Sequence, residues 1–586
     1  VESGSEHRSG LEPTVAYLQP IQGRKAITDL VFWIEFKAAG RDAGVHVNSQ
    51  TPACFRAGPA ACSEAMAVLF ACVFATVALQ AAVPSSYSNP VLAGDYPDPS
   101  VIRVGDEYWA TATTSEWAPL FPLLRSQDLV HWEQVGNVFQ TRPDWAMANF
   151  LAPEISEYRG AFYIYFVGRR KGGPLSISVA TAPHPRGPWT DHGPLIGQPA
   201  GSIDADTAQD EHGDRYLIWK EDGNSRNQPT PIWAQKLSAD GTGLVGEMTE
   251  LIRNTAAWEK NLVEGPFVLR RQDYFYLFYS GNGCCGTGCN YALGVARSRK
   301  LLGPWEKNPA NPILPANAAW RCPGHGSIVS TPGGRDFLLY HSYHAQTFTY
   351  VGRQGLLDEV KWGADAWPVI NEGRGPSVTA PVPIPNQRSV ARSGVIDEFD
   401  SSALKPYWQW PVNRQPQVKL AGGHLQLAPS SDHAQDQLGA ALGVHTSTGN
   451  YVATTCLQTS QLPPGTQAGL SAFGDNANAL GLTAGDGKLS VWRRRKNQHE
   501  IITTTPLPAA AWLQLRVKAV DGHKFHFSYS ADGRAWEDVG SAVDVEGNYL
   551  PPWDRGVRVA LVVGGAPNAS ANFDWLRLDN DNEPAK

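Results

Sequence analysis

The sequence predicts an all-β protein in which a five-bladed β-propeller precedes a C-terminal β-sandwich. First, aromatic strand-like runs recur five times between residues 85 and 372, at a spacing of roughly 50 to 65 residues that is typical of propeller blades. Second, beyond residue 394, short segments alternate apolar and polar residues with period two between turns, as strands of a sandwich do. The 57 Gly and 44 Pro residues supply the many turns that such folds require.

Each aromatic run is predicted to form one strand of a propeller unit, and several are followed by a second strand and a turn that ends in an aromatic residue. The runs are EYWATATT (107–114), AFYIYFVG (161–168), RYLIWKED (215–222), YFYLFYSG (274–281) and DFLLYHSY (336–343). One unit for each run makes five units, which is the basis for the predicted number of blades.

Three carboxylates stand in separate motifs just before three of these runs. They are Asp98 in GDYPDPSV, Asp204 in GSIDAD and Glu264 in NLVEGPF. A propeller arranges its inner strands around a central channel, so the three groups are expected to converge at one mouth of that channel. Taken singly, each could instead cap a strand or turn. Glycosidic hydrolysis needs two carboxyl groups, and a third can tune the acid, so the set predicts a sugar-cleaving enzyme.

Composition excludes one large class of function. Lys and Arg total 49 against 56 Asp and Glu, a formal charge of -7, so the chain lacks the basic excess that neutralises nucleic-acid phosphates. We therefore expect no nucleic-acid partner. The 20 Trp and 19 Tyr residues suit the apolar faces of sugar rings, although most of them are expected to fill cores.

The N-terminal part differs from the rest. Residues 1–65 show no periodicity and are expected to be a non-native or disordered extension. Residues 66–82 resemble a signal peptide, because Met66 precedes the short apolar run AVLFACVFATVALQAA. That run is short for a membrane span, so we expect no stable membrane insertion and a secreted or periplasmic protein. No Lys or Arg stands between Met66 and the run, which leaves an uncleaved anchor as the alternative.

Cysteine usage agrees with export. The CCGTGC cluster contains Cys284, Cys285 and Cys289, and it lacks the second CxxC pair or the nearby His residues of a zinc site. A disulfide within that loop, or from the loop to Cys322, is predicted. Cys456 is left over and is expected to be a buried free thiol.

Two boundaries divide the remaining chain. We predict a catalytic propeller at 83–372, a linker at 373–394 that is rich in Pro, Ser and Gly, and a sandwich at 395–586. The basic run that starts at Arg493 is interpreted as a solvated strand end rather than as a site for an anionic partner.

Motifs along residues 88–370 resemble family 43 glycoside hydrolases. The stretch GDYPDPSVIRVGDEYWATATTSEWAPLFPLLRSQDLVHW is similar to the opening of that family, and LAPEI, IDADTAQDEHGDRYLIW, VEGPFV and GHGSIV follow in the same order. The resemblance implies a five-bladed propeller that hydrolyses with inversion and releases xylose or arabinose from plant polysaccharides. Two positions depart from the pattern: Ala205 replaces a usual Pro, and Leu151 replaces a usual Trp.

The same resemblance implies roles for the three carboxylates. Asp98 is the expected general base, Glu264 the general acid, and Asp204 the group that orients Glu264 and raises its pKa. An inverting enzyme must fit a water beside its base, so the carboxyl groups of Asp98 and Glu264 are expected to lie roughly 6.5 to 9.5 Å apart. Glu264 is expected to have a raised pKa, through burial or a neighbouring anion.

The resemblance also implies contacts around the sugar. Arg353 in YVGRQG is expected to reach the hydroxyls of the terminal sugar, with a surface salt bridge as the alternative. Trp117 and Phe150 are expected to form walls of the subsite, with core packing as the alternative. His325 in CPGHGS is expected to lie beside a structural calcium or sodium ion in the channel, although a lone His is more often structural. No organic cofactor is expected, because acid-base hydrolysis needs none.

The C-terminal segment resembles the lectin-like (concanavalin A-like) sandwich of family 43 β-xylosidases. In such relatives a sandwich loop closes one side of the active-site funnel, which favours exo action on the ends of xylan or arabinoxylan chains. A β-xylosidase is therefore favoured, with an α-L-arabinofuranosidase or arabinan hydrolase as the alternative, since a few subsite contacts reverse such a preference. A non-catalytic carbohydrate-binding propeller and a retaining fructosidase-type propeller are the rivals of other classes.

Overall fold

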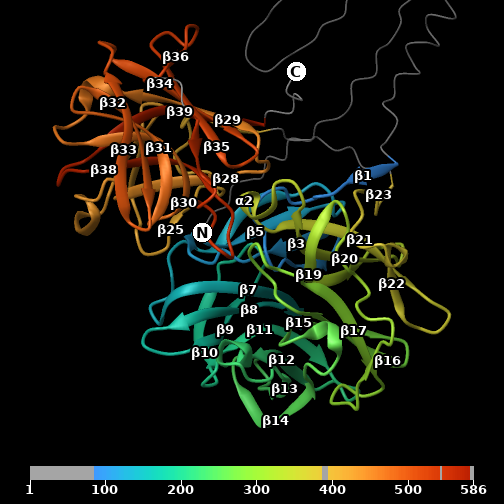
Figure 1. Cartoon of the computed structure of the whole chain (residues 1–586). Helices are drawn as coiled ribbons and strands as arrows, with labels where there is room; N and C mark the ends of the chain where they lie inside the picture. Colours follow the sequence, from blue (N-terminus) through green and yellow to red (C-terminus); the bar gives the residue numbers. More distant parts are fainter. Residues whose placement is uncertain (1–84, 386–393, 541–543, 581–586) are drawn as a thin grey trace, which may run out of the picture. The chain divides into compact units, whose positions relative to one another are not determined.

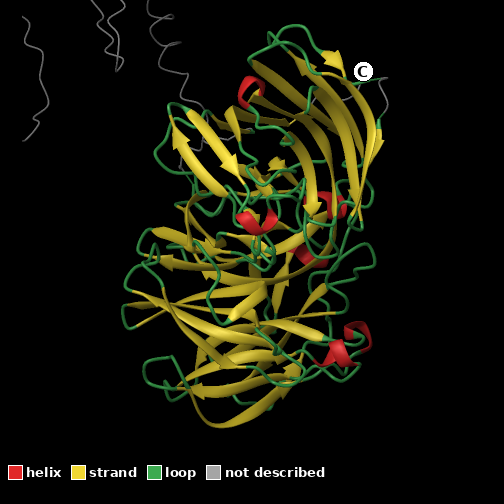
Figure 2. Cartoon of the chain, turned by 90° about the vertical axis from the view of Figure 1, so that its left-hand side faces the viewer, coloured by secondary structure: helices red, strands yellow, loops and turns green. Residues whose placement is uncertain are grey.

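The computed structural model describes residues 85–385, 394–540 and 544–580. The predicted extension 1–65, the signal-like segment 66–82 and part of the predicted linker lie outside the described residues. Strands dominate, and the helices are single turns (Figure 2). These turns are α2 (Phe348–Val351), η1 (Gly223–Arg226), η2 (Ala257–Glu259), η3 (Asn371–Gly373), η4 (Ser431–His433) and η5 (Thr459–Gln461).

No helix in the described part of the chain has both the length and the apolar character needed to cross a membrane.

The N-terminal half forms five antiparallel sheets of four strands each, which follow one another along the chain from blue to yellow in Figure 1. The first contains β2 (Ser100–Val104), β3 (Glu107–Thr111), β5 (Leu120–Ser126) and β6 (Glu133–Phe139). The second contains β7 (Ala146–Tyr158), β8 (Ala161–Arg170), β9 (Leu175–Ala182) and β10 (Thr190–Ile196). The third contains β11 (Ser202–Gln209), β12 (Arg215–Glu221), β13 (Ile232–Leu237) and β14 (Leu244–Ile252). The fourth and fifth contain β15 (Val263–Arg271), β16 (Tyr274–Gly281), β17 (Ala292–Ser298) and β18 (Glu306–Lys307), then β19 (Trp320–Ser330), β20 (Asp336–His344), β21 (Gln354–Trp362) and β22 (Pro368–Ile370).

The five aromatic runs are strands, as predicted, and each is the second strand of its sheet: β3, β8, β12, β16 and β20. Each is almost continuously buried, because neighbouring sheets pack against both of its faces. The predicted carboxylate motifs belong to the first strands or to the turns just before them.

The first strands of the five sheets lie side by side in a closed order. β2 contacts β7, β7 contacts β11, β11 contacts β15, β15 contacts β19, and β19 returns to β2. Side chains tie neighbouring strands together: the Ser327 hydroxyl on β19 accepts the Val101 N–H of β2, and the Asp206 carboxylate on β11 accepts the Val268 N–H of β15. A short pair, β1 (Ser86–Ser88) with β23 (Thr379–Pro381), joins the two ends of this half.

The C-terminal half is a sandwich of two antiparallel sheets, as predicted. The nine-stranded sheet contains β24 (Val395–Asp397), β26 (Gln417–Ala421), β27 (His424–Ala428), β29 (Tyr451–Gln458), β34 (Trp512–Val520), β35 (Lys524–Ser530), β36 (Glu537–Asp538), β37 (Val545–Glu546) and β39 (Ala571–Asn580). The six-stranded sheet contains β28 (Ala440–His445), β30 (Gln467–Asp475), β31 (Asn478–Gly485), β32 (Lys488–Arg495), β33 (Gln498–Pro506) and β38 (Arg558–Gly564). Leu513 and Leu515 of one sheet and Leu470 and Leu561 of the other are fully buried in a common core.

Residues 82–586 form one compact unit, so the two halves are packed together. The strand β25 (Trp410–Pro411) pairs with β4 (Trp117–Ala118), which links the two halves through the backbone. The buried Arg558 donates from Nη1 to Asp95 Oδ2 at 3.1 Å, and the Gly556 N–H donates to the same oxygen at 3.0 Å. Asp95 lies three residues before Asp98, so the C-terminal half directly supports the segment that carries a predicted catalytic residue.

Candidate active site

The three predicted carboxylates lie at one level of the ring of first strands. At this level each first strand, or the turn before it, carries a residue with positive φ. These residues are Asp98 (51°), Ala152 (41°), Asp204 (56°), Gly265 (58°) and His325 (40°). On β7, β11, β15 and β19 the ladder shifts register beside this residue, as at a β-bulge. A left-handed residue other than Gly costs about 1 to 3 kcal/mol, which the surrounding structure must offset, and such strain concentrates at functional sites.

Side chains hold this strained layer in place by accepting N–H groups from it. The Asp98 N–H donates to His341 Nδ1 at 3.0 Å, and the Ala152 N–H donates to Thr113 Oγ1 at 2.6 Å. The Gly265 N–H donates to Asp204 Oδ2 at 3.0 Å. The bulged strands β7 and β15 each donate such an N–H, and Asp204 both belongs to the layer and stabilises the residue that follows Glu264.

Asp98 is a buried, ionised carboxylate. Arg353 Nη1 donates to its Oδ1 at 2.9 Å, and Thr113 Oγ1 donates to its Oδ2 at 2.8 Å. Burial by itself would raise the pKa of Asp98, but the charge of the Arg353 guanidinium and then that of His325 outweigh it and hold that pKa well below its ordinary value. The group is thus ionised, as a general base must be before it accepts a proton.

His341 supports Asp98 as a neutral ring. Its Nδ1 accepts the Asp98 N–H, so that nitrogen carries no proton and the hydrogen sits on Nε2. Burial, more than the partly opposing effect of Asp98, lowers the pKa of His341 to about 4, which agrees with a neutral imidazole. His341 therefore orients the backbone of Asp98 and adds no positive charge.

Glu264 and Asp204 are buried together beside a lysine that the sequence analysis did not single out. Lys220 Nζ lies 2.7 Å from Glu264 Oε2 and 3.0 Å from Asp222 Oδ1, and its side chain is 1% exposed. A lysine inside the apolar run RYLIWKED was the only available signal, since a charge in a buried strand requires a partner.

Protonation tendencies differ between the two carboxyls of this pair. Burial is the main cause that raises the pKa of Asp204 to about 6; His325 and Lys220 oppose the rise, while the charge of Glu264 adds to it. Burial also acts on Glu264, but Lys220 overrides it and the pKa of Glu264 is lowered. The expectation of a raised pKa on Glu264 is therefore wrong for the ligand-free protein. The raised group is Asp204, and the reason is the ion pair with Lys220.

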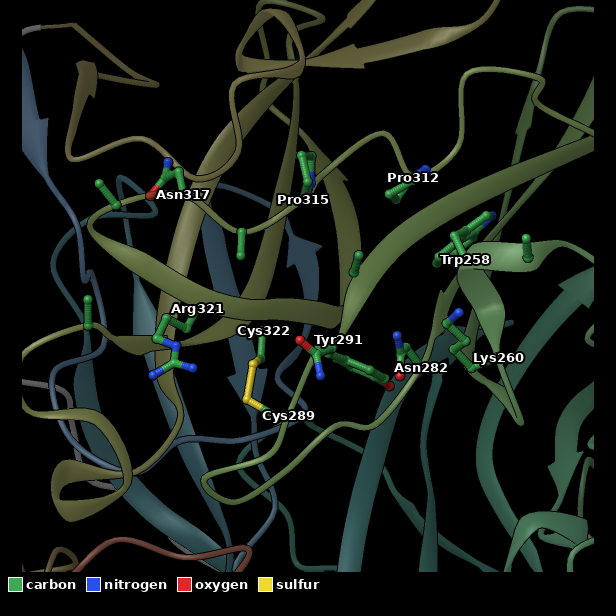
Figure 3. Close-up of a pocket in the computed structure, with 16 residues that line it drawn as sticks. Trp258, Lys260, Asn282, Cys289, Tyr291, Pro312, Pro315, Asn317, Arg321 and Cys322 are labelled. Carbon is green, nitrogen blue, oxygen red and sulfur yellow. A yellow bond between two sulfur atoms is a disulfide. The ribbon is translucent and has the colours of Figure 1, made fainter.

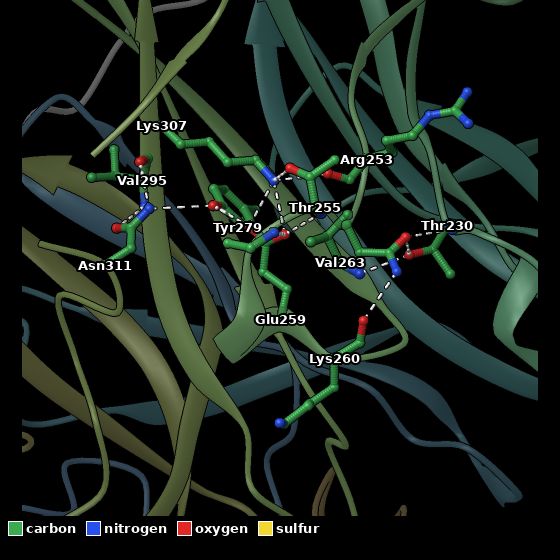
Figure 4. A network of polar contacts seen from close by, with 12 residues as sticks. Thr230, Arg253, Thr255, Glu259, Lys260, Val263, Tyr279, Val295, Lys307 and Asn311 are labelled. Atoms are coloured by element: carbon green, nitrogen blue, oxygen red, sulfur yellow. Dashed lines mark hydrogen bonds and ion pairs between the residues drawn. The ribbon is translucent and has the colours of Figure 1, made fainter. Parts of the chain in front are cut away.

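A polar network fixes the segment that precedes Glu264 (Figure 4). Glu259 is fully buried, and both of its carboxylate oxygens accept hydrogen bonds from Lys307 Nζ, at 2.7 and 2.8 Å. It also accepts two backbone N–H groups of its own turn. The N–H of Val263 donates to Thr230 Oγ1 at 2.7 Å. Glu264 is therefore anchored from both sides of its strand.

A loop of the C-terminal half reaches the base. Asp554 Oδ2 accepts the Ser115 hydroxyl at 2.8 Å, and the Asp554 carbonyl accepts Arg353 Nη2 at 3.4 Å. The neighbouring Trp553 is 67% exposed, the largest exposure among the exposed large hydrophobic side chains of the described residues. Arg353 therefore lies between Asp98 and this loop and is buried rather than in a surface salt bridge, and its contact with sugar hydroxyls stays a prediction.

Trp117 and Phe150 pack as core residues. Trp117 is 2% exposed and its ring meets Phe473 edge to face at 5.7 Å, inside an apolar cluster formed largely by the C-terminal half. Phe150 is fully buried and packs against Phe121. For both rings the structure shows the packing alternative, and a wall contact with sugar stays a prediction.

His325 lies beside the base, with Nδ1 3.4 Å from Asp98 Oδ1. Among the described residues, no group of three or more His, Cys, Asp or Glu side chains is arranged to hold a metal ion. The predicted calcium or sodium ion stays a prediction.

The cysteines pair as two disulfides, Cys284 with Cys285 and Cys289 with Cys322, so both predicted alternatives occur. Cys456 is free and buried, as predicted, and burial raises its pKa to about 11. The second disulfide lines a pocket of about 710 Å³ next to the site (Figure 3).

Buried carboxyl groups with opposed protonation tendencies are what glycosidic hydrolysis needs, so the site suits a glycoside hydrolase. The comparisons agree. The profile of Glycosyl hydrolases family 43 matches residues 87–368, and that of the Beta xylosidase C-terminal Concanavalin A-like domain matches residues 396–579. The chain belongs to glycoside hydrolase family 43.

Similar proteins extend over nearly the whole described chain. A Xylan 1,3-beta-xylosidase of a Vibrio species is 28% identical over 520 residues, which are 80% of this chain and 93% of that protein. A non-reducing end alpha-L-arabinofuranosidase of Bacteroides ovatus is 25% identical over 535 residues, covering 84% of this chain and 94% of that protein. The crystal structure of a family 43 protein from Bacillus licheniformis matches 84% of this chain and all of its own, with 27% identity and a TM-score of 0.74.

Proposed function

We propose that this protein is an exo-acting β-xylosidase that removes terminal xylose from xylan or arabinoxylan chains with inversion of configuration. The single observation that carries the proposal is the contrast between an ionised Asp98 and the proton-holding pair of Asp204 and Glu264. A base and an acid with separated pKa values are what inverting hydrolysis needs.

The five four-stranded sheets, with their first strands in a closed ring, support a five-bladed propeller as the catalytic domain. We place this domain at 83–372 and the sandwich at 395–586, with a linker at 373–394 between them, of which residues 379–381 form β23 and pair with β1 of the N-terminal half. The propeller brings first strands from five separate parts of the chain around one axis, which is why residues as distant as Asp98 and Glu264 can serve one bond.

In the proposed reaction a water attacks the anomeric carbon on the face opposite the leaving group. Asp98 takes the proton of that water, while Glu264 donates a proton to the glycosidic oxygen as the bond breaks. Asp204 shares the proton of the pair and holds the Gly265 N–H, so it positions Glu264 and adjusts its acidity. Lys220 favours the ionised form of Glu264, so this ion pair must weaken before Glu264 can donate a proton. In the proposed reaction, the bound sugar displaces the Lys220 ammonium from Glu264.

The loop that contains Trp553 and Asp554 supports exo action. It is hydrogen-bonded to Arg353 and Ser115, so it bounds the site on the side of the C-terminal half. A site closed on one side accepts chain ends and excludes long chains. The exposed indole of Trp553 offers a surface on which a sugar ring can stack.

An α-L-arabinofuranosidase is the second candidate, and the similarity to the Bacteroides ovatus protein of that name favours keeping it. A non-catalytic binding protein is disfavoured, because all three carboxylates are present in a charge environment suited to catalysis. We further propose a secreted or periplasmic location, which the two disulfides support, since disulfides persist in oxidising compartments.

The test is the initial rate of a chain that begins at Val83 on nitrophenyl β-xyloside and nitrophenyl α-arabinofuranoside, with Glu264→Gln alongside. Faster turnover of the xyloside, together with proton NMR that shows α-xylose as the first product from a β-linked substrate, would support the proposal. Preference for the arabinofuranoside would assign the second candidate, and turnover of neither sugar would contradict both.

A further inference from the structure

The pocket of about 710 Å³ is lined by none of Asp98, Asp204 and Glu264, so it lies outside the machinery described above. Its lining comes from the turn before β15, from the loop between β16 and β17, and from the chain leading into β19. Trp258, Lys260, Tyr291, Arg321 and the disulfide of Cys289 with Cys322 are drawn there in Figure 3. It is therefore built by the fourth and fifth sheets at the site's edge.

Tyr291 connects this pocket to the catalytic carboxylates. The residue lines the pocket, is 1% exposed, and its ring stacks on that of His341, the neighbour of Asp98, with ring centroids 5.8 Å apart. Burial and then the nearby charge of Glu264 raise the pKa of Tyr291 well above its ordinary value, so the phenol and the carboxyl are close neighbours. A general acid touches the oxygen of the leaving group, so the space adjoining Glu264 is on the leaving-group side of the scissile bond.

Charge in this pocket is opposite to that of the whole chain. The protein has a formal charge of -7, yet the described residues that line the pocket include Lys260 and Arg321 and not one Asp or Glu. Throughout 85–385, 394–540 and 544–580, no carboxylate forms an ion pair with either side chain. Two unneutralised cations at opposite ends of one pocket create a local field that attracts anions (Figure 3).

Both cations are presented by ordered backbone. Arg321 stacks over the Phe348 ring at 4.3 Å, and its neighbour Cys322 is tied to Cys289, which leads into Tyr291. Lys260 has a φ of 53°, and its carbonyl accepts Asn254 Nδ2 at 3.1 Å. A guanidinium held by stacking keeps its planar fork free for the two oxygens of a carboxylate.

We propose that this pocket is a leaving-group subsite for a saccharide that carries a carboxylate, such as a uronic acid substituent on the sugar next to the scissile bond. Arg321, whose guanidinium fork suits two oxygens, binds the carboxylate, Lys260 at the other end adds to the positive field that attracts it, and Trp258 borders the sugar. The inference rests on the proposed function, because it assigns the leaving-group side from the role of Glu264. It predicts a preference for acidic, uronic-acid-bearing xylan fragments over neutral ones.

The experiment compares kcat/KM for xylobiose with that for xylobiose whose reducing-end xylose carries glucuronic acid. The native chain should favour the acidic substrate, and Lys260→Gln combined with Arg321→Gln should lower the ratio of acidic to neutral kcat/KM by about three- to tenfold, since exposed charged contacts are modest. Lys300→Gln, an exposed lysine outside the lining, is the matched control and should leave the ratio unaltered. The preference should also weaken as salt is added.

Calorimetric measurement of acidic trisaccharide binding to the native chain and to the double variant tests the anionic-sugar subsite separately from the proposed function. If both proteins turn over xylobiose and the ratio of acidic to neutral kcat/KM is the same in the native chain and in the double variant, the inference is overturned while the proposed function stands. A chain that turns over no xyloside or arabinofuranoside, yet binds the acidic saccharide through Lys260 and Arg321, would overturn the proposed function and leave the anionic-sugar site supported. If Lys300→Gln lowers the ratio of acidic to neutral kcat/KM as much as the double variant does, the preference arises from the overall charge of the protein, which would contradict the inference.

Discussion

Lys220 Nζ and Glu264 Oε2 are 2.7 Å apart in a buried pocket that also contains Asp204. This contact decides which carboxyl of the pair holds the proton: Lys220 keeps Glu264 ionised, and burial leaves Asp204 with a pKa raised to about 6. The two carboxyls titrate as a coupled system, so the pH at which kcat/KM falls belongs to the pair. We expect the alkaline limb of the native profile near pH 6.

Lys220→Gln should move that alkaline limb to higher pH. Removal of a positive charge disfavours the carboxylate form of Glu264, so its pKa rises and the proton stays on the pair to higher pH. At neutral pH the change also leaves a buried carboxylate without its cation and should lower the free energy of unfolding by about 3 kcal/mol. The pH-rate profile and thermal unfolding measure the two effects.

Lys307→Gln is the matched control, because it breaks a buried ion pair with Glu259 that does not include a catalytic carboxyl. It should destabilise the protein but leave the alkaline limb where it is. An alkaline limb that shifts equally in both variants would contradict the role given to Lys220.

Asp204→Asn should move the alkaline limb in the opposite direction. The charge of Asp204 favours the protonated form of Glu264, so its loss lowers the pKa of Glu264 and the acid deprotonates at lower pH. The amide oxygen still accepts the Gly265 N–H, so substrate affinity should be retained while kcat falls by about 10²-fold. A profile whose alkaline limb does not move would count against the tuning role.

Glu264→Gln should be more harmful on natural saccharides than on activated ones. Xylobiose has a poor leaving group that needs a proton, so its kcat should fall by about 10²- to 10⁴-fold, whereas a nitrophenolate leaves without one. Stopped assays on the two substrates give the ratio. Asp98→Asn is the comparison, since loss of the base should harm both substrates alike, and equal losses in Glu264→Gln would argue against its role as acid.

Arg353→Met should raise the pH of the acidic limb. In the native protein the pKa of Asp98 is far below its ordinary value, so kcat/KM should stay level on the acidic side until the protein unfolds. A group with a depressed folded pKa contributes stability above its unfolded pKa, and that contribution is lost only as pH falls through the folded pKa. Without the Arg353 guanidinium the pKa of Asp98 is higher. Both kcat/KM and the stability contributed by ionised Asp98 should therefore be lost at a higher pH than in the native protein. Acid limbs that coincide in the two proteins would contradict this account.

Arg558→Met should destabilise the junction of the two halves by about 3 to 5 kcal/mol, because it leaves Asp95 buried without its cation. Calorimetry should show a lower unfolding temperature, and activity should fall with it, since Asp95 also accepts the Arg353 N–H. Arg493→Met removes an exposed pair with Glu500 and serves as the control that should change stability little. Similar losses in the two variants would contradict the importance of the junction.

Much of this molecule follows from local sequence pattern. The aromatic runs became strands within three residues of their predicted bounds, because alternation and β-branched or aromatic content are local properties. Asp98, Asp204 and Glu264 could be selected from separate motifs, since the chemistry needs carboxyl groups and the motifs recur before strands. Cysteine spacing left two disulfide alternatives open, one within the CCGTGC loop and one from that loop to Cys322. The structure contains both.

Protonation and packing were decided by the tertiary structure. Lys220 is 44 residues from Glu264 in the chain, so no local pattern predicts the ion pair between them. The pKa of Glu264 depends on that ion pair. Trp117 was expected to face sugar, but the C-terminal half, more than 300 residues away, surrounds its ring. The sequence by itself determined the strands, the family and the carboxyl groups, because these depend on residue type and order. Only the fold determined charge states and burial, because both depend on which distant side chains are brought within a few ångströms of each other.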